Sequence, residues 1–313
     1  MIRFNENAWN YIEEYLPAQE NVKRAVLSDF IWFMKRPVKY KDDATKIKDY
    51  IHHLHLKREN SINIHHVDEN LFIDIDIPKI ESELFAIYLN DKLLYYPIDK
   101  EVEAFTTMIG SELPYYVIQS HQIHSGRVEI VDRHNMTRED LEGVDAIMTN
   151  LIDCPIGVRT ADCVPVLLYD PVKRVIAAVH SGWRGTVLRI SQKTINEMIH
   201  HYGTNPSDLR AVIGPSIGPD AFIVHDDVES AFSKAGFPME LICKQHNKDE
   251  FTIDLWKANK WILEKAGVKP ANIHISGIYT YTRHDDFYSA RYEHNNKCGR
   301  NINVIRIKPI CGA

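Results

Sequence analysis

The sequence lacks the features that mark secreted, membrane and nucleic-acid-binding proteins. Its five cysteines are odd in number and form no Cys-x-x-Cys pair, so they favour a reducing compartment over a disulfide framework. No apolar run is long enough to span a bilayer, and the N-terminus lacks the basic-then-apolar order of a secretory signal. The net charge of −6 at pH 7 offers no positive field to nucleic acid or to a membrane surface. We therefore expect a cytoplasmic protein with neither of those partners.

What remains is the composition of an ordinary globular protein. The 313 residues are 44% hydrophobic and 26% charged, which suits one large domain or one domain plus an appendage. Apolar residues recur at helical spacing up to about residue 60, and short alternating runs follow, with Asn90 and Asp91 at a predicted hairpin. We predict a helix-rich N-terminal extension over residues 1–100, of unknown role, and a main domain over residues 101–313.

The main domain alternates strands with a few helices. The predicted strands are YYVIQS, RVEIVD, AIMTN, PVLLYDP, VIAAVHSG, LRAVIGPSI, NIHISGIY and INVIRIK. The predicted helices are 185–201, 226–235 and 254–266, and Gly203 is the expected stop of the first. Because strands outnumber helices and several are joined by short turns, the pattern predicts an α/β (α+β) protein with a mixed sheet.

Residues with metal-binding or nucleophilic side chains are densest between positions 119 and 185. Three segments carry them, QSHQIHSGRV, RTADCVPVLLYDP and AAVHSGWRG, and each places such a residue beside a predicted strand end. Two imidazoles and a thiolate, from His124, His180 and Cys163, would make a three-ligand shell for Zn²⁺ with a fourth position open. Gly182 would let the chain turn tightly and let a ligand approach closely.

Each of these residues also has a structural interpretation. Cys163 beside an apolar strand can be a small buried hydrophobe, and His180 can be a hydrogen-bonded core histidine. His124 competes with His121, but strand alternation would place the two on opposite faces, so we do not expect both to be ligands.

The same three segments resemble the central signature of the YfiH-like family, also described as the multicopper polyphenol oxidase or laccase domain. The runs TADCVPVLLYDP and AAVHSGWRGT carry the resemblance, and GVDAIMTN, AVIGPSIGPDAFIV and DFYSARYEHNNKCGRNINVI extend it in order over about residues 105–308. The family fold implies stacked mixed β-sheets flanked by helices, related to that of bacterial toxin deamidases.

Carried over position by position, the resemblance places metal ligands on His124, Cys163 and His180. It implies one zinc ion rather than copper, and a purine nucleoside phosphorylase that accepts adenosine, inosine, guanosine and methylthioadenosine and also deaminates adenosine. A laccase would need several copper centres, whereas the sequence offers one candidate site without His-x-His pairs around it.

The reaction needs further groups around this trio. Arginine suits phosphate because its planar fork binds two oxygens at once. Arg184 is the first candidate for the phosphate site, with Arg159 and Arg291 behind it. Asp162, next to Cys163, is a candidate for moving protons in deamination, or else a residue that orients its loop. His124 and His180 are candidate proton carriers in the case that no metal is bound.

The chain departs from the family pattern at two places. Met108 stands where the family's first motif has an arginine, and the loop and helix that normally follow it are missing before Gln122. Asp220 and Ala221 occupy the place of a cysteine pair. The histidines at 52–55 and 65–66 are expected to be solvated rather than metal-bound.

Two other functions therefore stay open beside the phosphorylase. One is a cysteine hydrolase-like enzyme with Cys163 as nucleophile and His180 as its base. The other is a catalytically weakened relative that acts as a binding or assembly protein, because the family's first loop is lost. Separately, a homo-oligomer stays open as the state of assembly.

Overall fold

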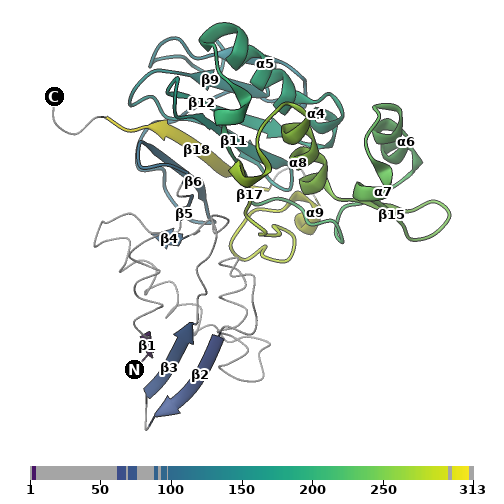
Figure 1. Ribbon diagram of the computed structural model, residues 1–313. Helices are drawn as coiled ribbons and strands as arrows, with labels where there is room; N and C mark the ends of the chain where they lie inside the picture. Colours follow the sequence, from purple (N-terminus) through teal and green to yellow (C-terminus); the bar gives the residue numbers. More distant parts are fainter. Residues whose placement is uncertain are drawn as a thin grey trace. The chain divides into compact units, whose positions relative to one another are not determined.

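The computed structural model describes residues 93–96, 98–294 and 298–309 with their side chains, and four earlier strands by their backbone. The chain divides into two compact units, Met1–Lys100 and Glu101–Ala313. Figure 1 shows the second unit as sheets overlaid by helices. Among the described residues, no helix has both the length and the apolar character needed to cross a bilayer.

The described secondary-structure elements of the first unit are strands. A three-stranded sheet has the order β1-β3-β2, formed by Ile2–Phe4, Asn70–Ile75 and Ile62–Val67. β4 (Tyr88–Asn90) pairs antiparallel with β5 (Leu93–Tyr95), and Asn90 lies opposite Leu93, which confirms the predicted hairpin. Residues 5–61, where helices were predicted, lie outside the described residues.

The second unit is built around a mixed six-stranded sheet of order β17-β13-β11-β12-β9-β8. In chain order its strands are β8 (Val128–Ile130), β9 (Ala146–Thr149), β11 (Val164–Asp170), β12 (Val175–Ser181), β13 (Arg210–Ile213) and β17 (Ile273–Ile275). β8 runs parallel to β9 and β13 parallel to β17, while the other pairs are antiparallel. The mixed sheet and the flanking helices confirm the predicted fold class.

A second sheet packs on one face of the first and explains why β11 and β12 are buried along their whole length. Its strands in this unit, in spatial order, are β6 (Val102–Thr107), β18 (Asn301–Ile307), β10 (Ile156–Thr160) and β7 (Ile118–Gln119). A buried hydrogen-bonded chain joins Thr106, Asn303 and Thr160 across its strands, so these polar groups are satisfied inside the core. Prediction missed β6 and β10.

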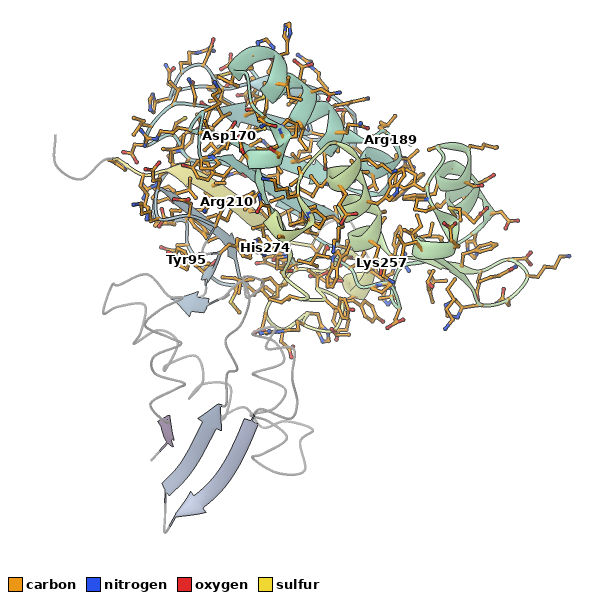
Figure 2. All side chains as sticks on the ribbon, in the orientation of Figure 1. Tyr95, Asp170, Arg189, Arg210, Lys257 and His274 are labelled. Carbon is orange, nitrogen blue, oxygen red and sulfur yellow. The ribbon has the colours of Figure 1, made fainter. Side chains whose placement is uncertain are left out.

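Helices cover the other face of the first sheet. α5 (Ile190–Tyr202) and α8 (Leu255–Lys265) pack there with a large apolar cluster beneath them, and side chains fill the layer (Figure 2). α5 ends where Gly203 takes a left-handed conformation with φ of 67°, as predicted. The predicted helix 185–201 is two helices, because Arg189 has φ of 55° and an α-helix cannot continue through it. α4 (Trp183–Val187) precedes this break.

Smaller elements complete the unit. β14 (Ile223–Val224), β16 (Phe251–Ile253) and β15 (Cys243–Gln245) form a three-stranded sheet. α6 (Asp226–Lys234) and α7 (Met239–Ile242) accompany this sheet at one side of the second unit (Figure 1). α9 (Ala290–Glu293) is a single turn close to the start of β18.

Asp254 is the N-cap of α8, and its side chain accepts a hydrogen bond from the backbone N–H of Lys257 at 2.9 Å. Asp254→Ala should lower the free energy of unfolding by about 1 kcal/mol, measured by urea denaturation, because it leaves a helix-end donor unsatisfied. Glu264→Ala is the control at the other end of α8. Its exposed ion pair with Lys260 should matter by less than about 0.5 kcal/mol. Equal losses in the two variants would contradict the capping role.

Candidate functional site

The strand order brings four side chains to one end of the first sheet. Cys163 directly precedes β11, and His180 lies near the end of its antiparallel neighbour β12. Asp145 directly precedes β9, which is antiparallel to β12 on the other side. His124 lies in the loop that leads into β8, which runs parallel to β9. In an antiparallel pair, the start of one strand lies beside the end of its neighbour. All four residues therefore meet at the same end of the sheet.

The three predicted ligands lie close together. One ligand atom from each of His124, Cys163 and His180 falls within 4.8 Å of the others. The Cys163 Sγ and His124 Nε2 atoms are 3.7 Å apart, and the two imidazole rings lie edge to face with centroids 4.9 Å apart. His180 is buried, Cys163 is half-buried and His124 is exposed, so the cluster is open on one side. This arrangement can hold one metal ion with a position left for a further ligand.

Asp145 supports two members of this cluster, and sequence reasoning missed it. Its carboxylate is fully buried and accepts a hydrogen bond from His180 Nδ1 at 2.7 Å. It also accepts the backbone N–H groups of Ile123, His124 and Ser125 at 3.1, 2.9 and 2.7 Å. The one available signal was an acidic residue at the start of a predicted apolar strand, in GVDAIMTN.

These contacts set the charges of the site in the absence of metal. Burial disfavours the Cys163 thiolate, but the charge of His180 and a hydrogen bond with His124 outweigh it and lower the pKa of Cys163 to about 6. Burial also disfavours the charged imidazole of His180, yet Cys163 and Asp145 raise its pKa to about 9. Burial opposes ionisation of Asp145, but His180 and the Ser125 N–H hold its pKa at about 2. A thiolate and a buried carboxylate together favour a cation between them.

Asp162 is engaged as a brace for the surrounding loops. Its Oδ1 accepts a hydrogen bond from Thr280 Oγ1, and its Oδ2 accepts one from the backbone N–H of Arg291, both at 2.7 Å. Its backbone carbonyl accepts the N–H of Ile217. With both carboxylate oxygens occupied and φ of 81°, Asp162 is placed to orient the loop before Cys163. Of the two roles considered for it, this geometry favours the orienting one.

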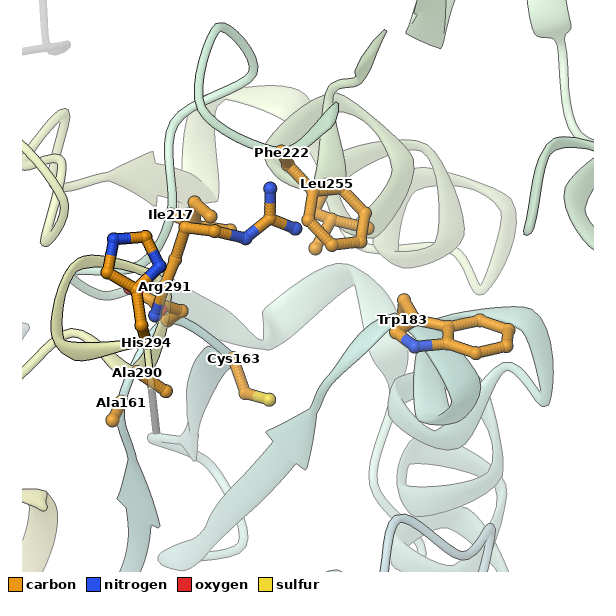
Figure 3. Close-up of a pocket in the computed structure, with 10 residues that line it drawn as sticks. Ala161, Cys163, Trp183, Ile217, Phe222, Leu255, Ala290, Arg291 and His294 are labelled. Atoms are coloured by element: carbon orange, nitrogen blue, oxygen red, sulfur yellow. The ribbon is translucent and has the colours of Figure 1, made fainter. Parts of the chain in front are cut away.

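A cleft of about 470 Å³ opens beside the cluster. Figure 3 shows the Cys163 side chain between Arg291 and His294 on one side and Trp183 on the other. The remaining lining residues are Ala161, Asp162, Ile217, Phe222, Leu255 and Ala290. The cleft therefore combines a thiol, a guanidinium and two aromatic walls, and its volume lies in the range of small-molecule sites.

The three candidate arginines occupy different surroundings. Arg291 lines the cleft, and its guanidinium donates to the carbonyls of Ala221 and Ile223 rather than to a carboxylate. Arg184 is exposed and lies 4.4 Å above the ring of the cleft residue Trp183. Arg159 is half-buried and is not among the cleft-lining residues. Burial and then the charges of Arg138 and Arg300 lower its pKa.

The two departures from the family pattern lie outside the site. Met108 is buried, and the segment after it brings Tyr115 against Phe105 and beneath the guanidinium of Arg306, on the second sheet. Asp220 is exposed, and Ala221 contributes only its carbonyl to Arg291. None of these side chains lines the cleft described above.

The argument from strand alternation at His121 and His124 was wrong in its premise. Residues 120–127 form no regular strand, and His124 adopts φ of 64°. His121 instead pairs with Glu142, its Nδ1 lying 2.5 Å from that carboxylate. Gln122 turns its amide to the backbone of Arg159, with which it exchanges two hydrogen bonds. His124 therefore reaches the cluster through a left-handed turn, which no periodic pattern predicts.

Comparison with known proteins agrees with the resemblance. The family model of the multi-copper polyphenol oxidoreductase laccase matches residues 97–308. A purine nucleoside phosphorylase of Bacteroides thetaiotaomicron is 37% identical over 196 residues, 62% of this chain and 72% of that protein. An adenosine deaminase from an unknown prokaryotic organism is 39% identical over 56% of this chain and 69% of its own. The purine nucleoside phosphorylase YlmD of Bacillus subtilis is 34% identical over 73% of this chain and 83% of its own.

Solved structures show the same fold. The hypothetical protein YfiH of Bacillus licheniformis superposes with a TM-score of 0.65 at 24% identity, over 70% of this chain and 97% of that one. YlmD of Geobacillus stearothermophilus gives a TM-score of 0.62 at 22% identity, over 70% and 97%. Residues 97–308, which the family model matches, contain the whole cluster and its cleft. The chain thus belongs to the multi-copper polyphenol oxidoreductase laccase family, that of the YfiH-like proteins.

Proposed function

We propose that this protein is a zinc-dependent purine nucleoside phosphorylase, accepting adenosine, inosine, guanosine and methylthioadenosine, that also deaminates adenosine. The observation that carries the proposal is the open His124–Cys163–His180 cluster beside a cleft with a cation and aromatic walls. Relatives named for purine phosphorolysis and for adenosine deamination are 34–39% identical to this chain over 56–73% of its length. Residues 101–313 would form the catalytic domain, with residues 1–100 as an extension.

The donor set fits Zn²⁺. With zinc bonds of about 2.3 Å to sulfur and about 2.0 Å to nitrogen, tetrahedral ligands lie roughly 3.5 Å apart. The distance of 3.7 Å between Cys163 Sγ and His124 Nε2 is close to that separation. Among the described residues, this is the one cluster of three or more candidate ligands, whereas a laccase needs several copper centres. When bound at these three residues, zinc would supply Lewis-acid polarisation of an oxygen in the cleft.

The cleft residues suit the other parts of a nucleoside. Trp183 and Phe222 offer flat or apolar surface for a purine, and Arg291 offers the fixed fork that phosphate prefers. In phosphorolysis a phosphate oxygen bonds to the anomeric carbon as the bond to the purine breaks. The electron pair of the broken bond stays on the purine nitrogen, and this nitrogen gains the proton that hydrogenphosphate brings. His124 and His180 could carry protons only without a bound metal, because zinc would occupy their ring nitrogens.

Product analysis tests the proposal directly. Zinc-loaded protein incubated with adenosine or inosine should release a free purine base and ribose 1-phosphate only when phosphate is present. Adenosine alone should yield inosine and ammonia. If zinc binds stoichiometrically and neither substrate is turned over, the phosphorylase and deaminase proposals both fail and the binding-protein function is favoured.

Arg291 is the arginine that we expect to bind phosphate. Arg291→Lys keeps the charge but loses the fork, and should raise the KM for phosphate about tenfold, because a charged hydrogen bond is worth about 1.5–3 kcal/mol. Arg306→Lys is the control, since Arg306 pairs with Glu103 and Asp153 on the second sheet. Steady-state kinetics with phosphate varied at saturating inosine measures both. An unchanged KM for phosphate in Arg291→Lys, with a raised KM in Arg184→Lys or Arg159→Lys, would show that one of those arginines binds phosphate instead.

One observation favours a second candidate function. Cys163, His180 and Asp145 stand in the order of a thiol, an imidazole and a carboxylate, as in cysteine hydrolases. In that case His124 would be dispensable, whereas a three-ligand zinc site needs it. If the protein is the zinc-dependent phosphorylase, removal of zinc by a chelator and the His124→Ala substitution should each abolish turnover. If it is a cysteine hydrolase, turnover should survive both.

A further inference from the structure

We infer that Asp145 is a positioning residue that holds two of the three proposed metal ligands at once. The inference rests on the metal role proposed above for His124 and His180. Asp145 touches neither the cleft nor the position that a metal would take, because it is fully buried behind the imidazole of His180. Its action is therefore carried entirely by the hydrogen bonds it accepts.

The bond to His180 decides which ring nitrogen faces the cluster. An ionised carboxylate only accepts hydrogen bonds, so His180 Nδ1 must carry a proton and donate it to Asp145 Oδ1 at 2.7 Å. In the neutral ring, the form that binds a metal, the lone pair is then on Nε2. The backbone of the same pair is also joined, by the His180 N–H to the Asp145 carbonyl at 2.8 Å. Ring orientation and strand position are thus fixed together.

The bonds to the amides hold the second ligand. His124 sits in a left-handed turn with φ of 64°, which is costly for a residue with a side chain. The N–H groups of Ile123, His124 and Ser125 all point to the Asp145 carboxylate. The Ser125 hydroxyl donates a hydrogen bond to the carbonyl of Gly143, two residues before Asp145. The carboxylate therefore stabilises the turn that brings His124 Nε2 to Cys163.

Asp145→Asn separates this role from packing, because asparagine has the same shape but one acceptor oxygen fewer. If its nitrogen faces His180, it donates to Nδ1 and moves the ring proton to Nε2, which blocks that ligand atom. If its nitrogen faces the other way, it opposes the N–H groups of Ile123 and Ser125 and releases the His124 turn. Either orientation of the amide disables one ligand.

Asp170→Asn is the matched control. Asp170 is equally buried and lies at the far end of β11 (Figure 2). Its Oδ1 accepts the N–H groups of Val172 and Lys173, both at 2.9 Å, while its Oδ2 has no partner. An amide nitrogen can replace that Oδ2 without breaking a hydrogen bond.

The experiment measures zinc affinity by chelator competition in the full-length wild type and the two variants. Asp145→Asn should weaken zinc binding by about 10- to 100-fold, as loss of a supporting carboxylate does in other zinc sites. Asp170→Asn should stay within about twofold of wild type, and circular dichroism checks that both variants fold. Wild-type affinity in a folded Asp145→Asn variant would overturn the inference.

A second measurement needs no variant and no bound metal. Proton NMR of the wild type should show a downfield, slowly exchanging His180 Nδ1–H signal both with and without zinc. Absence of that signal from the metal-free protein would overturn the inference, including the case where Asp145→Asn does not fold. Should the wild type bind no zinc, the metal proposal fails, while this signal still reports on the bond from His180 to Asp145.

Discussion

Cys163→Ala should remove both stoichiometric zinc and phosphorolysis, with kcat/KM falling by at least about a thousandfold. Cys163 is the proposed thiolate ligand, and its low pKa of about 6 means that the metal-binding form is already present at neutral pH. Two imidazoles alone leave the shell short of the three protein ligands that catalytic zinc sites use. Elemental analysis of the purified variant and product analysis with inosine and phosphate measure the two losses together.

Cys243→Ala is the control for this prediction. Cys243 is a half-buried free cysteine in β15, outside the cluster and the cleft, so its removal should leave zinc content and turnover unchanged. The variant also discriminates between functions. A Cys163→Ala protein that keeps its zinc but loses turnover would make Cys163 a nucleophile rather than a ligand. A Cys163→Ala protein that keeps both its zinc and its turnover would show that Cys163 is neither a metal ligand nor a nucleophile.

Local patterns predicted the core of this unit well, for physical reasons that hold at each strand. The runs PVLLYDP and VIAAVHSG are continuously apolar because both faces of β11 and β12 are covered, one by helices and one by the second sheet. Such runs are easily recognised in a sequence. Their ends also locate Cys163 and His180, because antiparallel pairing places the start of β11 beside the end of β12.

The parts that escaped prediction depend on contacts between distant segments. β10 reads as IGVRT, with a glycine and an arginine, and exists because it pairs with β18 and β7. The break at Arg189 goes with a guanidinium that binds the Ala235 carbonyl and lies 5.2 Å from the ring of Trp261. Neither neighbour is close in sequence, so helical periodicity alone extended the helix through it.

The arginines show the same limit. Residue chemistry placed Arg184 first among the candidate phosphate ligands, with Arg159 and Arg291 behind it. The structure separates them by surroundings. Arg291 reaches the cleft because α9 is tied to Asp162, 129 positions earlier in the chain. Arg159 faces the charges of Arg138 and Arg300 instead.

Gly182 was predicted to allow a tight turn and the close approach of a ligand. The first reason does not apply, and the second stays a prediction. Its φ of −62° and ψ of 173° are accessible to any residue, so backbone strain does not require a glycine here. Space does. A Cβ atom at Gly182 would lie 2.9 Å from Cys163 Sγ and 3.1 Å from His124 Cδ2. Cys163 and His124 therefore pack directly against Gly182, in space that a larger residue would occupy.

Gly182→Ala should accordingly disable the site while leaving the fold intact. Because the backbone accepts alanine, the whole effect comes from displacing Cys163 and His124, and overpacking of this kind costs about 1–3 kcal/mol. That range corresponds to zinc binding weaker by roughly 5- to 150-fold, since about 1.4 kcal/mol is a factor of ten. Turnover should fall further, because the displaced groups also border the cleft. Chelator competition and initial rates with inosine and phosphate measure the two effects.

Gly126→Ala is the matched control, in the same loop as His124. Its Cβ would come nearest to Lys193 Nζ, the free end of a flexible side chain, and then to Leu188 Cβ at 3.4 Å. The lysine can move aside, so zinc affinity and turnover should stay within about twofold of wild type. If the two alanine variants behave alike, the close contact of Gly182 with Cys163 does not shape the site. If only Gly182→Ala loses zinc, the room for the metal is set by the absence of one methyl group between a thiol and an imidazole.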